Sequence, residues 1–158
     1  MLSKYRPFAW QASSGRRSSQ RGVGLIEVLV AVLVLAIGLL GIAGLQSRAL
    51  KNGQSAFERS QAVTLTYLML DAMRANVNAA RTGQYNMNRT CNVNAGGTLI
   101  TNDQRLWLQS MKQTLGDRDT TCGEINCVGN RCTIRVFWDD SRATEGSDNY
   151  SVETISVL

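Results

Sequence analysis

The order of apolar and polar positions first separates a polar leader from a long apolar stretch. Residues 1–22 are rich in Ser and Arg and show no apolar period. Residues 23–45 are almost wholly apolar, and Glu27 is their single charge. At about 1.5 Å of rise per residue, a helix of this length spans the ~30 Å hydrocarbon core of a bilayer. We therefore expect a cytoplasmic leader peptide over 1–22 and a transmembrane helix over 23–45.

Beyond this stretch the apolar residues thin out to one helical face. Residues 46–80 contain no Pro and a single Gly, Gly53. The apolar spacing is helical, so the sequence predicts an amphipathic continuation of the helix that ends near Thr82-Gly83. The expected core face holds Ala49, Ala56, Phe57, Leu65, Leu68, Met69, Ala72 and Met73. The polar residues expected in solvent are Arg48, Lys51, Glu58, Arg59 and Arg74.

The remaining residues, 81–158, predict a small head domain that begins with a loop and a short helix. Asn, Gly and Thr dominate 83–102, which favours a loop. Thr101, followed by Gln104 three residues later, resembles a capping box, and Gly116 is a typical helix stop. The helix between them has an apolar face that we expect to pack on the domain core, and this face is made of Trp107, Leu108, Met111 and Leu115.

The end of the chain predicts strands. Residues 132–139 alternate, which points Ile134, Val136 and Trp138 to a core and turns Thr133, Arg135 and Asp139 outward. Residues 124–127 form an expected partner strand through the turn 128–131, and 150–157 form a third strand. The sequence therefore predicts an α+β fold, in which a long N-terminal helix packs on a small antiparallel sheet.

The distribution of charge predicts the orientation of the chain in the membrane. The chain has 17 Lys and Arg against 12 Asp and Glu. Residues 1–22 hold no acid and five of the bases, so 12 bases balance the 12 acids in the rest of the chain. This balance excludes an electrostatic nucleic-acid binder. The leader bases hold the N-terminus in the cytoplasm by the positive-inside rule and are Lys4, Arg6, Arg16, Arg17 and Arg21. The apolar run is too long for a secretory signal peptide, and no small-x-small site follows it.

Catalytic chemistry has little support in the sequence. There is no histidine, and no nucleophile elbow, phosphate loop or metal motif occurs. We expect neither enzyme activity nor a cofactor. Asp139 and Asp140 follow a predicted strand and could bind Ca²⁺, but two adjacent acids in a loop are more often solvated.

Four cysteines, Cys91, Cys122, Cys127 and Cys132, lie in the part of the chain expected in the oxidising periplasm, which favours disulfides. Four cysteines allow three pairings. We favour Cys127–Cys132 across the hairpin loop and Cys91–Cys122 between the long loop and the sheet. A zinc site is the alternative, which the spacing and the absence of histidine disfavour.

Two features of the apolar stretch leave alternatives open. A carboxylate within a membrane costs on the order of 3 kcal/mol, so Glu27 either lies shallow and reaches the interface or has a cationic partner. Gly38, Gly41 and Gly44 recur at every third position. They favour either close packing against another helix or a softened stretch that can unwind.

These residues carry a resemblance. The basic leader, Gly22, and an apolar helix with Glu27 at its fifth position resemble the class III signal of type IV prepilins. The continuation from Glu27 to Gln46 resembles the PilV-type minor pilins. The first mature residue in many pilins is Phe, whereas here it is Val23. The resemblance implies the fold of a type IV pilin.

The resemblance also implies processing and partners. Prepilin peptidase would cut after Gly22 and methylate the new amino group of Val23, and Glu27 would pair with the amine of a neighbouring subunit. The implied partners are other minor pilins, the major pilin and the inner-membrane assembly platform. The implied location is the bacterial inner membrane and then the pilus. A pseudopilin of a type II secretion system and an uncut membrane-anchored binding protein are the alternatives.

Overall fold

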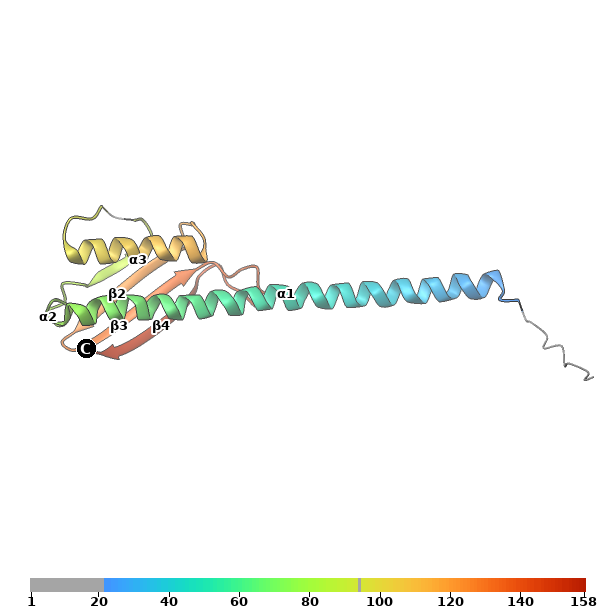
Figure 1. Ribbon diagram of the computed structural model, residues 1–158, viewed down its shortest axis with the longest axis horizontal. Coiled ribbons are helices and arrows are strands. Elements are labelled where there is room, and N and C mark those ends of the chain that lie inside the picture. The colour runs from blue at the N-terminus through green and yellow to red at the C-terminus, as the bar shows by residue number, and fades with distance from the viewer. Residues whose placement is uncertain (1–21, 94) are drawn as a thin grey trace, which may run out of the picture. The chain divides into compact units, whose positions relative to one another are not determined.

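The computed structural model describes residues 22–93 and 95–158, and the expected leader over 1–21 lies outside them. The chain divides into two units on either side of the Leu40–Gly41 bond. The long helix α1, Leu25–Ala75, begins in the first unit and ends in the second (Figure 1). In the first unit every described residue is exposed, so this part of α1 packs on nothing within the described chain.

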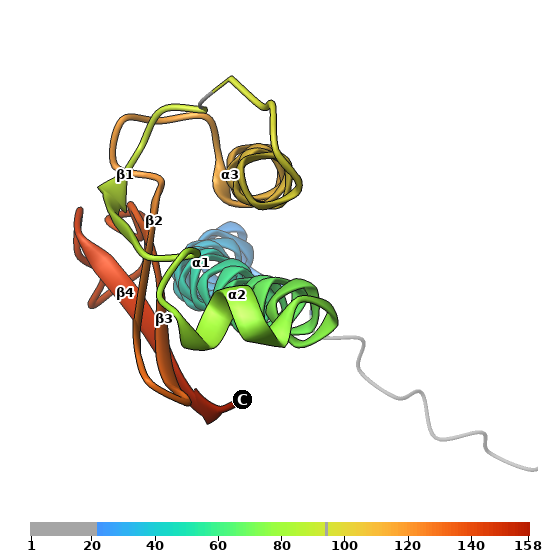
Figure 2. The same cartoon turned by 90° about the vertical axis from the view of Figure 1, so that its left-hand side faces the viewer.

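The second unit is a four-stranded antiparallel sheet covered on one face by helices. The strand order is β1-β2-β3-β4, and each strand pairs antiparallel with the next. Figure 2 shows α1, α2 and α3 on the same side of this sheet. The strands are β1 (Met87–Thr90), β2 (Cys122–Val128), β3 (Arg131–Trp138) and β4 (Tyr150–Val157), and the shorter helices are α2 (Val77–Arg81) and α3 (Leu99–Leu115). The predicted α+β architecture is confirmed.

The core lies between the helices and the inner face of the sheet. Leu65, Met69 and Met73 recur at every fourth position of α1, so they lie on one face of the helix, and all three are buried. The indole of Trp107 in α3 donates to the carbonyl of Leu65 at 2.8 Å, which ties the two helices together. The sheet contributes the inward residues that the alternation predicted, Ile134, Val136 and Trp138, all at 0% exposure.

Part of the predicted core face of α1 is wrong. Phe57 is 61% exposed and Leu68 is 52% exposed, and Ala49 and Ala56 are exposed too. Glu58, expected in solvent, is instead buried at 9% exposure. The physical reason over residues 52–59 is that the loop between β3 and β4 presents polar side chains to this part of α1. Apolar periodicity alone does not show this neighbour.

The end of the helical region differs in one detail from the expected continuous helix. α1 stops at Ala75, and Asn76 leaves helical geometry with φ −128° and ψ 53° before α2 begins. The helical region then ends at Thr82 and Gly83, as predicted. Gly83 has a φ of 76°, which glycine adopts without the penalty that a Cβ would impose.

Two predicted boundaries near α3 are wrong. The expected loop 83–102 contains the strand β1, which is only four residues long and has a register shift against β2. Such a short edge strand gives too little alternation to detect. α3 begins after Thr98, whose hydroxyl accepts from the amide of Thr101 at 3.2 Å, while the Thr101 hydroxyl accepts from the amide of Thr98 at 2.9 Å. The capping box therefore starts three residues before the predicted one, and the predicted stop at Gly116 is confirmed.

The contact between β2 and α3 yields a test of the core. A Cβ built on Gly123 would lie 2.4 Å from Cζ3 of Trp107 and 2.7 Å from Cε of Met111. Since overpacking a filled core typically costs about 1–3 kcal/mol, we expect Gly123→Ala to lower the free energy of unfolding by about that amount. Urea unfolding of the detergent-solubilised protein, followed by the fluorescence of the buried Trp107 and Trp138, measures this.

Gly53→Ala is the matched control for this test. A Cβ there meets nothing within 4 Å, and alanine favours a helix over glycine by up to ~1 kcal/mol. The control should therefore be neutral or stabilising. Equal stability of both variants would contradict the described packing of β2 against α3.

Candidate functional site

The predicted cleavage bond lies at the start of the described chain. Gly22 and Val23 are exposed and precede the helix. The carbonyl of Gly24 accepts the first hydrogen bonds of α1, from the amide of Glu27 at 2.9 Å and from that of Val28 at 3.3 Å. The Gly22–Val23 bond is thus outside helical geometry, which leaves its backbone groups free to bind in a peptidase. Cleavage there, and methylation of Val23, remain predictions.

Glu27 lies in the first turn of α1 and is exposed. An acidic side chain is favourable at this end of a helix, because the first amides carry a partial positive charge. Within residues 22–93 and 95–158 no Lys or Arg forms an ion pair with Glu27. A cationic partner from another chain therefore stays a prediction.

The apolar start of α1 is exposed on all sides. Its large side chains range from 50% exposed at Val28 to 87% at Leu25. This part of the helix is long and apolar enough to cross a membrane. A helix that is apolar all round is stable only when lipid or other apolar helices cover it. This is consistent with a membrane-anchored protein.

The three glycines of this stretch do not interrupt α1. A Cβ on Gly38, Gly41 or Gly44 would meet nothing within 4 Å among the described residues. The open space is compatible with a helix packing closely on this face, and the regular helix is compatible with local softening under load. Both interpretations stay open.

All four cysteines form disulfides, with the favoured pairing. Cys127 and Cys132 face each other across β2 and β3 at the hairpin end. Cys91 follows β1 and is bonded to Cys122 at the start of β2. These bonds leave no free thiol for zinc, and the described part of the chain has no cluster of metal-ligating side chains.

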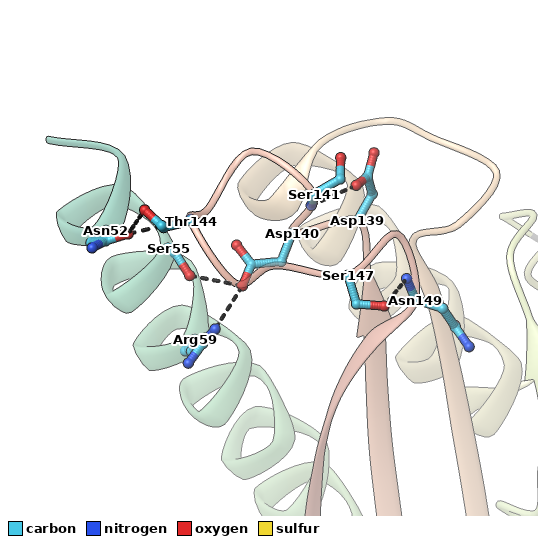
Figure 3. Close-up of polar contacts among 9 residues, drawn as sticks. All are labelled: Asn52, Ser55, Arg59, Asp139, Asp140, Ser141, Thr144, Ser147 and Asn149. Atoms are coloured by element: carbon cyan, nitrogen blue, oxygen red, sulfur yellow. Dashed lines mark hydrogen bonds and ion pairs between the residues drawn. The ribbon is translucent and has the colours of Figure 1, made fainter. Parts of the chain in front are cut away.

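The acidic pair after β3 differs from the expected solvated loop. Asp140 is 2% exposed, and its Oδ2 accepts from the Ser55 hydroxyl at 2.7 Å and from Nη2 of Arg59 at 2.9 Å. Both partners come from α1 (Figure 3). The hydrogen bond to Asp140 raises the pKa of Arg59 above its ordinary value. Sequence reasoning missed this contact, although Ser55 and Arg59 are four residues apart and so share a helical face.

Asp139 has a different role from its neighbour. Its carboxylate accepts from the backbone amide of Ser141 at 2.9 Å and forms an ion pair with Arg118. The bonds from Ser141 lower the pKa of Asp139 below its ordinary value, and the charge of Arg118 adds to this effect. Asp139 therefore holds the start of the loop and joins it to Arg118 before β2, whereas Asp140 joins the loop to α1.

The comparisons with known proteins concern the N-terminal part. Residues 17–43 match the model of the prokaryotic N-terminal methylation motif. The chain carries a class III prepilin signal. This signal is consistent with a prepilin of the type IV pilin type, and it supports processing by a prepilin peptidase. No curated protein and no solved structure matches the chain.

The lowered pKa of Asp139 predicts a pH dependence. Its ionised form is favoured in the folded state, so its contribution to stability is present above the ordinary carboxyl pKa of ~4 and is lost as the pH falls through the lower folded value. We expect Asp139→Asn to lower the melting temperature at pH 7, and we expect the gap to the wild type to narrow below pH ~4. Melting of the detergent-solubilised protein between pH 3 and pH 7, in roughly unit steps, measures it.

The exposed Asp148 provides the control for charge alone, because Asp148→Asn removes one carboxylate from the same loop. A gap that stays constant from pH 7 to pH 3 in Asp139→Asn would contradict the assigned role of this carboxylate.

Proposed function

We propose that this protein is a minor pilin of a type IV pilus, cut after Gly22 by prepilin peptidase and then methylated on Val23. The observation that carries the proposal is the joining of three features in one chain. The methylation motif over 17–43 opens an apolar helix that is exposed on all sides, and the same helix continues into a one-sided contact with an antiparallel sheet. A filament subunit needs the motif for processing, the apolar helix for anchoring and the sheet for a folded head.

The precursor in this proposal crosses the inner membrane once. The basic leader stays in the cytoplasm, residues 23–45 span the bilayer, and the head lies in the periplasm. The two disulfides support this orientation, because the periplasm is oxidising whereas the cytoplasm keeps thiols reduced.

Glu27 acts in assembly in this proposal. Cleavage creates an amino group on Val23 that is positively charged near neutral pH. A lone carboxylate in an apolar environment is costly, whereas a carboxylate paired with a cation is tolerated. Docking the amine of one subunit against Glu27 of its neighbour satisfies both charges at once, and a wrong register leaves both unpaired. Glu27 therefore selects the register of the filament.

The proposed partners follow from this role. The subunit acts with other minor pilins in the complex that starts a filament, with the major pilin and with the inner-membrane assembly platform, and it lies at the tip. We propose no catalytic activity and no cofactor. A type II secretion pseudopilin is the second candidate, because the same N-terminal signal precedes both kinds of subunit. Recovery in sheared surface pili favours the pilin, and loss of enzyme secretion with normal pili on deletion favours the pseudopilin.

Processing gives the most direct test. We expect the intact mass of the membrane-extracted protein to match a chain that starts at Val23 and carries one added methyl group. We expect Gly22→Val to give the full 158-residue mass, because a branched side chain next to the cut bond blocks the peptidase. Gly38→Ala, within the apolar helix, serves as the control and should be processed normally. A full-length wild-type mass from cells with an active peptidase would establish the uncut membrane anchor instead.

The assembly role of Glu27 gives a second test. Glu27→Gln keeps the size of the side chain but leaves the neighbouring amine unpaired. Since removing one partner of a buried ion pair is strongly destabilising, we expect cleavage to continue while the amount in sheared pili falls more than ~10-fold. Immunoblots of the sheared and membrane fractions measure both quantities.

Asp148→Asn removes an exposed carboxylate from the head, serves as the control and should assemble normally. Undiminished incorporation of Glu27→Gln would show that Glu27 lies shallow at the interface rather than in an ion pair.

A further inference from the structure

Polar side chains join the loop between β3 and β4 to one short segment of α1. The hydroxyl of Thr144 donates to Oδ1 of Asn52 at 2.8 Å, and Asp140 accepts from Ser55 and Arg59. Figure 3 shows that these contacts involve residues on successive turns of α1. A further ion pair joins Arg142 to Glu58 at 3.5 Å. We define the clasp as residues 52–59 of α1 together with residues 140–147 of the loop.

The clasp contains no apolar core. Its buried side chains are Ser55, Glu58 and Asp140, and all three are polar. The first buried apolar residue of α1 is Ala62, beyond the clasp. Opening the clasp therefore exchanges hydrogen bonds, two ion pairs and the contact of Arg59 with the Tyr150 ring for contacts with water, without exposing an apolar core. Opening α1 beyond Ala62 would expose apolar surface, which costs far more.

The loop half of the clasp is stiff. The amide of Asp140 donates to the carbonyl of Ser147 at 2.8 Å, which closes the loop at its base. A Cβ on Gly146 would lie 1.7 Å from the carbonyl oxygen of Asp140, so the backbone at Gly146 lies directly against the backbone at Asp140. The closed backbone holds Asp140 and Thr144 in one loop, where both contact α1.

Hollows flank the clasp on two sides of Ser55. One, of about 400 Å³, lies between α1 and residues 143–145, and Arg59 forms part of its wall. The other, of about 470 Å³, is lined by Lys51, Glu58 and Arg142 among others. Water therefore has access to both sides of the hydrogen bonds, and it can replace them without first entering the core.

We propose that the clasp opens and closes as one unit, releasing residues 52–59 of α1 while the rest of the head stays folded. The opening itself follows from the contacts of this chain alone. Its use rests on the proposed function: these two turns follow the membrane helix closely, and their release gives a filament subunit new helical surface for a neighbour. The head then adjusts to its neighbours without losing its core.

Hydrogen exchange of the full-length protein in detergent, read by mass spectrometry, tests the clasp. Residues 52–59 lie inside the continuous helix α1, and an open clasp leaves them held by helical hydrogen bonds alone, so they exchange faster than helix that is covered by the core. In the wild type we expect residues 53–60 to share one protection, lower than that of residues 65–73, with the one amide of 141–147 that donates to α1, that of Thr144 on Oδ1 of Asn52. In Asp140→Asn we expect both clasp segments to exchange about tenfold faster, because a charged hydrogen bond is lost, while residues 65–73 stay unchanged.

Asp148→Asn is the matched control. It removes the same charge from the same loop, but Asp148 is exposed and lies outside the clasp. It should leave residues 53–60 at wild-type exchange. Arg59→Gln removes the same ion pair from the helix side, together with the contact of the guanidinium with the Tyr150 ring. It should speed exchange at least as much as Asp140→Asn, so it replaces that variant if the latter does not fold.

Three results would overturn the proposal. Residues 53–60 could be as protected as residues 65–73 in the wild type. The substitutions could speed exchange in every segment alike, which would make the clasp part of the global unfolding unit. They could also affect only one of the two clasp segments or neither, which would show that the segments do not open together. None of these results depends on whether the chain is processed as a prepilin.

Discussion

An apolar helix exposed on every side cannot remain in water, and this constraint governs how α1 is built. The first part of the helix buries nothing within the described chain, so it needs lipid or other apolar helices around it. From Ala62 onward the same helix buries only one face, against the sheet and α3. A single helix thus joins a stretch that needs an apolar cover from outside the described chain to a stretch that packs on one face, and its composition changes along α1 accordingly.

The head domain is small, and its core depends on the contact of α1 with α3 and the sheet. Trp107 fills the space between these elements and donates a hydrogen bond from its indole N–H to the carbonyl of Leu65. Gly123 leaves room for the same ring on the sheet side. The two disulfides fix β2 to its surroundings at both ends, through Cys122 and Cys127. Together they compensate for the limited apolar area that a domain of this size can bury.

Glu27 and Asp140 show two solutions to the same electrostatic problem. Asp140 is buried where an unpaired charge is costly, and in the proposed function Glu27 lies in such a place as well. Asp140 has its partners, Ser55 and Arg59, within the chain, so the charge serves to hold a loop on α1. Glu27 has no cationic partner within residues 22–93 and 95–158, and in the proposed function the partner is the amine of another subunit. The first charge organises the head, and in the proposed function the second organises the filament.

The sequence by itself determined the features that depend on local pattern. The membrane-length apolar run, the methylation motif, the inward face of β3 and the stop at Gly116 follow from composition, periodicity and single-residue preferences. Only the tertiary structure decided the features that depend on distant neighbours. Phe57 is exposed and Glu58 buried because a loop some 80 residues later presents Asp140 and Arg142 to α1. A helical face is core or surface according to what packs on it, and apolar spacing does not encode that partner when the partner is polar.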